Sequence, residues 1–240
     1  MVEVWERIAK GRSTILLDRN MLFGPEEKCP HCHEKRKTVD HLATQCDRML
    51  AHDYMQRHNE ALRCIHLQIC NKYGLTKNKK IRNHSVQECI ANNRVEIRVD
   101  TRIPTGIQVK YNKPDIFIYD KMRNEIVIVE VGITSFDNLH TVETEKKHKY
   151  DLLANHCGAV YKAKTRIIPY VMTWDGIVTS YHGGYCKELG LDRRVEAYIQ
   201  SRVLKMTFES ISLEYRRRPV DESQGILEES LIPRVELMTV

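Results

Sequence analysis

The stretch that decides the fold reads Lys113-Pro-Asp-Ile-Phe-Ile-Tyr-Asp120, then Lys-Met-Arg-Asn124, then Glu125-Ile-Val-Ile-Val-Glu130. Two runs rich in β-branched and aromatic residues flank four polar residues, which is typical of a β-hairpin. If residues 121–124 form the turn, Asp120 faces Glu125, and counting outward brings Asp115 opposite Glu130. We therefore expect Asp115 and Glu130 to lie side by side on one face of a sheet.

The segments around this hairpin alternate between strand-like and helical patterns. Further strands are predicted at residues 95–100 and 166–173, and the second hairpin strand extends to residue 133. Apolar spacing predicts a long helix at residues 54–73, ended by Gly74. Shorter helices are expected near residues 85–92, 141–155, 183–189 and 193–209. This order of elements indicates a mixed α/β domain.

The composition excludes several classes of protein. The chain has 240 residues, of which 42% are hydrophobic and 29% charged, so we expect a globular protein rather than a disordered or fibrous one. No apolar run approaches the ~18 residues of a membrane span, and the first residues lack a signal-peptide pattern. We expect an intracellular protein with no membrane partner. The net charge of +6 is compatible with a polyanionic partner without requiring one.

Composition along the chain suggests four parts. Residues 1–76 are expected to form a small metal-binding and helical module, and residues 77–83 a basic linker. Residues 84–218 would then form the α/β domain, followed by a loosely ordered tail at 219–240. In the linker, Lys79, Lys80 and Arg82 are candidate contacts to nucleic-acid phosphates, with an ordinary solvated linker as the alternative.

A cluster of metal-type ligands lies near the N-terminus. The spacing C-x2-C-x8-H-x4-C formed by Cys29, Cys32, His41 and Cys46 supplies four donors for a closed tetrahedral zinc site. The alternative is a loop of free cysteines. A zinc-bound segment would serve either as a structural staple or as a contact to nucleic acid, and the pattern leaves both open.

A second set of metal-type residues occurs in the long predicted helix. These residues are His58, Cys64, His66 and Cys70. Their helical spacing favours ordinary core and surface positions over a second metal site.

The paired acids of the hairpin carry the main functional hypothesis. Like charges opposed across two strands destabilise the sheet unless positive charge lies between them. Two carboxylates favour Mg²⁺ or Mn²⁺, and Gly132 on the face of Glu130 leaves room for a ligand or another segment. The alternative is that Asp115 and Glu130 are merely solubilising charges. Asp120, on the opposite face, is expected to be a solvated hairpin end, and Asp100 and Glu88 are additional candidates for the site.

The helix after the hairpin supplies a candidate lysine. At about 100° per residue, Lys146 falls at the centre of the apolar stripe, whereas Lys149 is about 60° away and Lys147 about 100° away. Lys146 is therefore expected to face the acids, where its ammonium would act on water or phosphate, with Lys149 in reserve. The alternative is a lysine that reaches solvent along the helix. Tyr150 is expected mainly as a core aromatic.

Pro114-Asp115, fourteen intervening residues, Glu130-Val-Gly and a lysine on the next helix together resemble the PD-(D/E)xK nuclease superfamily. With the preceding Cys/His knuckle, residues 25–190 resemble the restriction-like endonuclease domain at the C-terminus of non-LTR (LINE-type) retrotransposon polyproteins. One departure concerns Gly132, which stands where the superfamily usually carries its lysine, so the lysine role moves to the helix.

The resemblance implies a restriction-endonuclease-like mixed sheet flanked by helices, with a small N-terminal zinc-knuckle and helical module. It also implies Mg²⁺-dependent hydrolysis of DNA leaving a 5′-phosphate, with Asp115 and Glu130 as metal ligands. The nick would prime reverse transcription of the element RNA by an upstream reverse transcriptase domain, in the nucleus. The alternative is a catalytically inactive zinc-knuckle protein that binds nucleic acid.

Overall fold

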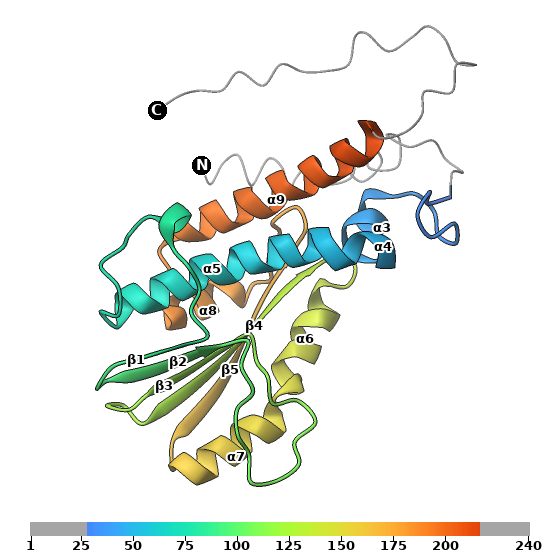
Figure 1. Ribbon diagram of the computed structural model, residues 1–240. Helices are drawn as coiled ribbons and strands as arrows, with labels where there is room; N and C mark the ends of the chain where they lie inside the picture. The colour runs from blue at the N-terminus through green and yellow to red at the C-terminus, as the bar shows by residue number, and fades with distance from the viewer. Residues whose placement is uncertain (1–27, 217–240) are drawn as a thin grey trace, which may run out of the picture.

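The computed structural model describes residues 28–216 (Figure 1). The predicted tail at 219–240 and the first 27 residues of the predicted N-terminal module lie outside the described residues. In chain order the elements are α3 (Val39–Thr44), α4 (Asp47–Met49), the π-helix η1 (Leu50–Tyr54), α5 (Met55–Lys72), the 3-10 helix η2 (Ile81–Asn83), β1 (Cys89–Ala91), β2 (Val95–Val99), β3 (Ile116–Asp120), β4 (Glu125–Thr134), α6 (Leu139–Lys149), α7 (Asp151–Tyr161), β5 (Lys164–Thr173), α8 (His182–Leu189) and α9 (Arg193–Arg216).

The five strands form one mixed sheet in the order β1-β2-β3-β4-β5. Neighbouring strands are antiparallel from β1 to β4, whereas β4 and β5 are parallel and are joined through α6 and α7. The predicted hairpin register is confirmed, since Ile116 pairs with Val129 and Asp120 with Glu125. The α/β class predicted from the sequence, a mixed sheet flanked by helices, is therefore confirmed.

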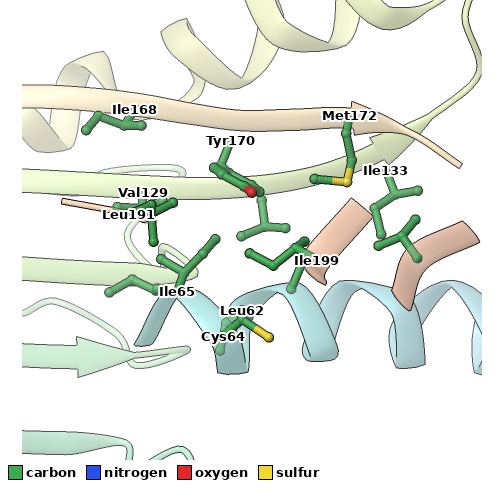
Figure 2. Close-up of a cluster of buried hydrophobic side chains, with 14 of the residues drawn as sticks. Leu62, Cys64, Ile65, Val129, Ile133, Ile168, Tyr170, Met172, Leu191 and Ile199 are labelled. Atoms are coloured by element: carbon green, nitrogen blue, oxygen red, sulfur yellow. The ribbon is translucent and has the colours of Figure 1, made fainter. Parts of the chain in front are cut away.

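Helices cover both faces of the sheet, because the hairpin strands are apolar on both sides (Figure 1). On one face α5, α8 and α9 pack against the odd-numbered residues of β4, such as Val129. Figure 2 shows Ile65 of α5 and Ile199 of α9 in this cluster. On the other face α7 and the loop before β3 pack against Phe117, Ile126 and Ile128. Glu130 and Gly132 belong to this second face by strand alternation.

Helix α5 of the predicted N-terminal module shares a hydrophobic core with the sheet. Leu62 and Ile65 of α5 lie in the same hydrophobic cluster as Ile97 and Val129 of the sheet. The predicted linker at residues 77–83 therefore does not separate two hydrophobic cores.

Two predicted helices differ from the structure. Residues 85–92 contain no helix but β1, whose Ile90 pairs with Ile97, because the edge of β2 offers a ladder that local propensity does not reveal. The helix predicted at 141–155 is interrupted at Tyr150, which separates α6 from α7 and turns its side chain into the core. Within residues 28–216, no helix is long and apolar enough to cross a membrane.

The expectation for Asp120 was wrong. Its side chain is buried rather than solvated, and its Oδ1 atom accepts hydrogen bonds from the backbone N–H groups of Met122 (3.1 Å) and Arg123 (3.0 Å). A carboxylate that closes its own turn in this way is typical of Asp at a turn start. Asp120 thus stabilises the hairpin whose register positions the acids.

Candidate functional site

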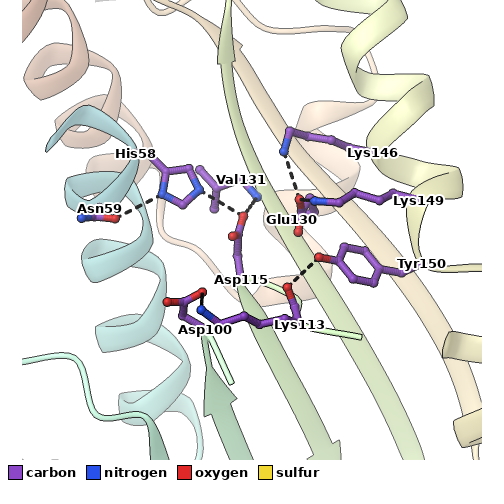
Figure 3. A network of polar contacts seen from close by, with 10 residues as sticks. All are labelled: His58, Asn59, Asp100, Lys113, Asp115, Glu130, Val131, Lys146, Lys149 and Tyr150. Carbon is purple, nitrogen blue, oxygen red and sulfur yellow. Dashed lines mark hydrogen bonds and ion pairs between the residues drawn. The ribbon is translucent and has the colours of Figure 1, made fainter. Parts of the chain in front are cut away.

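The two opposed acids occupy one end of the β3–β4 hairpin (Figure 3). Asp115 lies immediately before β3, and Glu130 lies within β4 with its side chain only 2% exposed. The Oδ2 atom of Asp115 accepts a hydrogen bond of 2.7 Å from the backbone N–H of Val131, the residue after Glu130. This bond fixes Asp115 to the strand that carries the second acid.

Both candidate lysines contact Glu130. The Nζ atoms of Lys146 and Lys149 lie 3.1 Å and 2.5 Å from its Oε1 atom. Lys146 faces inward as predicted, and the reserve candidate Lys149 reaches the same oxygen, because a lysine chain is long enough to span an offset of about 60° around the helix. The structure thus places two ammonium groups on one carboxylate.

Gly132 provides the space that Lys146 occupies. A Cβ atom at Gly132 would lie 2.7 Å from Cε and 3.0 Å from Cδ of Lys146. The room expected beside Glu130 is therefore filled by the aliphatic stem of the lysine.

His58 is a site residue that sequence reasoning missed. It projects from α5 on the opposite side of the hairpin end, and its Nε2 atom lies 3.1 Å from Oδ2 of Asp115 (Figure 3). Burial acts to lower the pKa of His58. The hydrogen bond to Asp115 and the negative charge of that carboxylate outweigh burial, so the pKa of His58 is raised. For Asp115, burial acts to raise the pKa, while the His58 contact and the Val131 N–H together lower it. The nearest sequence signal was the helical spacing of His58, which does not indicate its partner.

The charges of the site explain how two acids can share a hairpin end. Positive charge lies on both sides of the pair, with Lys146 and Lys149 on Glu130 and His58 on Asp115. The repulsion expected from facing carboxylates is thus compensated by side chains of the chain itself.

One oxygen of this site remains without a hydrogen-bond partner. Within the described residues, the buried Oε2 atom of Glu130 accepts no hydrogen bond. Because a buried carboxylate oxygen is costly to leave unpaired, such an atom is suited to a ligand that the chain does not supply. A carboxylate pair with one unused buried oxygen fits the all-oxygen preference of Mg²⁺ or Mn²⁺.

The neighbouring contacts hold the Pro114-Asp115 segment in place. The Tyr150 hydroxyl donates a hydrogen bond of 2.7 Å to the carbonyl of Lys113, so this core aromatic ties the segment to the junction of α6 and α7. Asp100 is mostly exposed and pairs with the Lys113 ammonium at 2.7 Å. Glu88 is exposed immediately before β1.

The structure brings the four predicted zinc ligands together. Their ligand atoms all lie within 4.8 Å of one another. The Sγ atoms of Cys29 and Cys46 are 3.7 Å apart, and Sγ of Cys32 is 3.3 Å from Nε2 of His41. Tetrahedral zinc with bonds of about 2.0–2.3 Å requires ligand separations of about 3.4–3.8 Å, so the donor set and its spacing fit zinc.

Local structure explains how these ligands meet. The backbone N–H of Cys29 donates to the Lys35 carbonyl at 2.8 Å, which closes the turn that carries Cys32. His41 projects from α3, whose first turn is capped by Thr38, and Cys46 directly follows that helix. Burial raises the pKa of Cys46 to about 11, so a buried thiolate there requires a cation.

The knuckle residues are attached to the α/β domain. The Trp174 indole N–H donates to Asp40 of α3 at 2.5 Å, and the Arg57 guanidinium of α5 donates to the carbonyl of Ala43. The buried cysteines Cys29 and Cys46 also belong to the hydrophobic cluster of the sheet.

The remaining predicted residues do not gather at one site, although Sγ of Cys70 lies 3.6 Å from Nε2 of His66. His58 contacts Asp115 and His66 contacts His84 at 2.7 Å, so the helical set with Cys64 and Cys70 forms no metal cluster among the described residues. The linker residues Lys79, Lys80 and Arg82 are exposed around η2.

Comparisons with known proteins add little to this geometry. No family model matches the chain, and no curated protein matches it significantly. One solved structure that resembles it is an N-terminal domain of a reptarenavirus L protein, with 16% sequence identity, 90% of this chain and 86% of that chain covered, and a TM-score of 0.35. This score does not establish a common fold.

Proposed function

We propose that the chain is a metal-dependent endonuclease that nicks DNA at the acidic centre formed by Asp115, Glu130, Lys146 and Lys149. The proposal rests on the contacts that the two carboxylate oxygens of Glu130 make. Both lysines contact its Oε1 atom, while its buried Oε2 atom accepts no hydrogen bond within the described residues.

Asp115 and Glu130 would hold Mg²⁺ or Mn²⁺. When bound, the ion supplies Lewis-acid activation of water and of the phosphodiester. The two carboxylates are already balanced by two ammonium groups. A divalent cation would therefore leave the site with net positive charge, which favours an anionic phosphodiester.

The side chains around the acids have distinct roles in this proposal. Lys146 and Lys149 stabilise negative charge that develops on the phosphate, and either ammonium can orient the attacking water. His58 and the Val131 N–H both contact Oδ2 of Asp115. Because these contacts fix the carboxylate group, they also fix the orientation of its other oxygen, Oδ1. Tyr150 anchors the backbone just before Pro114.

The biological context proposed here rests on the resemblance to non-LTR retrotransposon nucleases. The nick would leave a 5′-phosphate and a 3′-hydroxyl, and the hydroxyl would prime reverse transcription of the element RNA by an upstream reverse transcriptase domain. The substrate would then be nuclear target DNA. The zinc knuckle would either stabilise the fold of the domain or bind nucleic acid.

Nicking of supercoiled plasmid in the presence of Mg²⁺ tests the proposal. We expect Asp115→Asn and Glu130→Gln to lower the rate by about 10³-fold or more, since the metal contributes several kcal/mol to the transition state. Glu145→Gln, an exposed acid on α6, removes the same charge outside the site and is the matched control. Sealing of the nick by DNA ligase reports the 5′-phosphate.

A parent protein that binds plasmid but never nicks it would favour the alternative, an inactive nucleic-acid-binding protein. Nicking that persists in both Asp115→Asn and Glu130→Gln would show that the acids are not the catalytic centre. Calorimetry with Mn²⁺ measures metal binding separately from nicking. If the two acids hold the ion, Asp115→Asn and Glu130→Gln should lose Mn²⁺ binding as well as activity.

A further inference from the structure

A second group of metal-type side chains lies where α8 meets α9. His182 and Cys186 are four residues apart in α8 and therefore share one helix face, and Glu196 lies in the first turn of α9. Their ligand atoms lie within 4.8 Å of one another. No sequence motif indicates this group, because Glu196 lies ten positions after Cys186 and in another helix.

The histidine of this group is buried without hydrogen bonds. His182 is 1% exposed, and neither Nδ1 nor Nε2 makes a hydrogen bond within the described residues. The hydroxyl of Tyr170 is also buried and unpartnered there, and its ring centroid lies 4.6 Å from that of His182. Buried polar groups normally make hydrogen bonds, so imidazole and phenol groups that make none at one place suggest that a partner from outside the chain belongs there.

The donor set fits zinc by type and by spacing. Imidazole nitrogen, thiolate and carboxylate are all zinc ligands, and three protein ligands leave a fourth position for water. His182 Nε2 lies 3.5 Å from Glu196 Oε1. This separation agrees with the ~3.4 Å between two ligands that each lie about 2.1 Å from a tetrahedral ion.

The group is partly open to solvent. Glu196 is 23% exposed at the side chain, which provides access from solvent.

We propose that His182, Cys186 and Glu196 form a second zinc site, independent of the cysteine knuckle, that ties the start of α9 to α8. The ion would replace the missing hydrogen bonds of His182 with a coordinate bond. Because α8 and α9 pack against the sheet through Leu189, Ile199 and Val203, zinc at their junction would hold this helical layer in place. This link between α8 and α9 would not depend on nuclease activity.

The zinc content of the full chain, measured by inductively coupled plasma mass spectrometry, tests this inference. We expect about two zinc ions per chain in the parent, and about one in each of Cys186→Ala, Glu196→Gln and the knuckle variant Cys46→Ala. Cys157→Ala, which removes another buried cysteine from the opposite sheet face, is the matched control and should retain both ions.

Further outcomes separate this site from the knuckle. If Cys186→Ala and Glu196→Gln keep the parent's zinc content, the inference is overturned. If Cys46→Ala keeps it while Cys186→Ala loses an ion, the second site stands and the knuckle assignment falls. Should Cys186→Ala fail to fold, Glu196→Gln decides, because its side chain is partly exposed and changes shape little. Cobalt substitution gives an independent signal, since loss of the Cys186 thiolate should weaken the sulfur-to-cobalt charge-transfer absorption.

Discussion

The cysteine knuckle and the acidic centre differ in how their charges are balanced. In the knuckle the thiols of Cys29 and Cys46 are buried against each other, and burial raises the pKa of Cys46 to about 11. In the acidic centre, Glu130 already contacts two ammonium groups and Asp115 contacts His58. We therefore expect folding of the first region to depend on a metal ion, whereas in the second region the ion would be needed only for the proposed chemistry.

Metal removal should separate the two regions most strongly. Loss of the knuckle zinc in Cys46→Ala should lower the Tm by at least about 10 °C, because structural zinc contributes several kcal/mol and each kcal/mol corresponds to about 2–4 °C for a chain of this size. Magnesium withdrawal should lower the Tm by at most about 4 °C, since weak ligands stabilise little. Differential scanning calorimetry measures both, with the exposed Cys89→Ala as control. Equal shifts for the two metals would refute the contrast.

The lysines test whether the acidic centre acts through its cations. Lys146→Ala and Lys149→Ala should each lower the nicking rate by roughly 10²-fold, because both ammonium groups lie on Glu130 and act mainly in the transition state. Lys147→Ala, an exposed lysine on the same helix, should be nearly silent. Single-turnover nicking rates provide the measurement. Full activity in one of the two contacting-lysine variants would assign the role to the other alone.

Gly132→Ala offers a gentler perturbation of the same centre. The added Cβ atom would meet Lys146 Cε at 2.7 Å, so the flexible lysine must move away from Glu130. We expect a nicking rate about 10-fold lower with a Tm change of only a few degrees, because the contact involves a movable side chain. Gly158→Ala, a glycine of α7 outside the site, serves as a control for activity. An unchanged rate would mean that the position of Lys146 is not critical.

The basic linker should have the smallest effect. Neutralising Lys79, Lys80 and Arg82 together should flatten the slope of log K against log salt for DNA binding by up to about 3, since each lost phosphate contact lowers the slope by roughly 0.9. The nicking rate at saturating DNA should not change, because these exposed residues lie outside the acidic centre. Fluorescence anisotropy over a salt series provides the slopes. An unaltered slope would place the DNA path elsewhere.

Much of both regions could be predicted from the sequence because their decisive relations are local. The four knuckle ligands fall within residues 29–46, and the hairpin register follows from a four-residue turn. Lys146 was predicted from helical phase alone. The contact of Lys149 could not be, because it depends on the reach of its side chain and on where α6 lies above β4.

Other features depended on residues far apart in the chain. Residues 85–92 form strand β1 rather than a helix because β2 provides a partner. His58 is 57 residues from Asp115, and only the packing of α5 against the sheet brings them together. Likewise, Glu196 joins His182 and Cys186 only through the turn between α8 and α9.

The sequence by itself determined the α/β class, the facing acids and the four knuckle ligands, because strand alternation, turn length and ligand spacing act over a few residues. Only the tertiary structure decided which cations neutralise those acids and which buried groups lack partners. These properties follow from the packing of helices onto the sheet, and packing is set by the shapes of distant surfaces rather than by any local period.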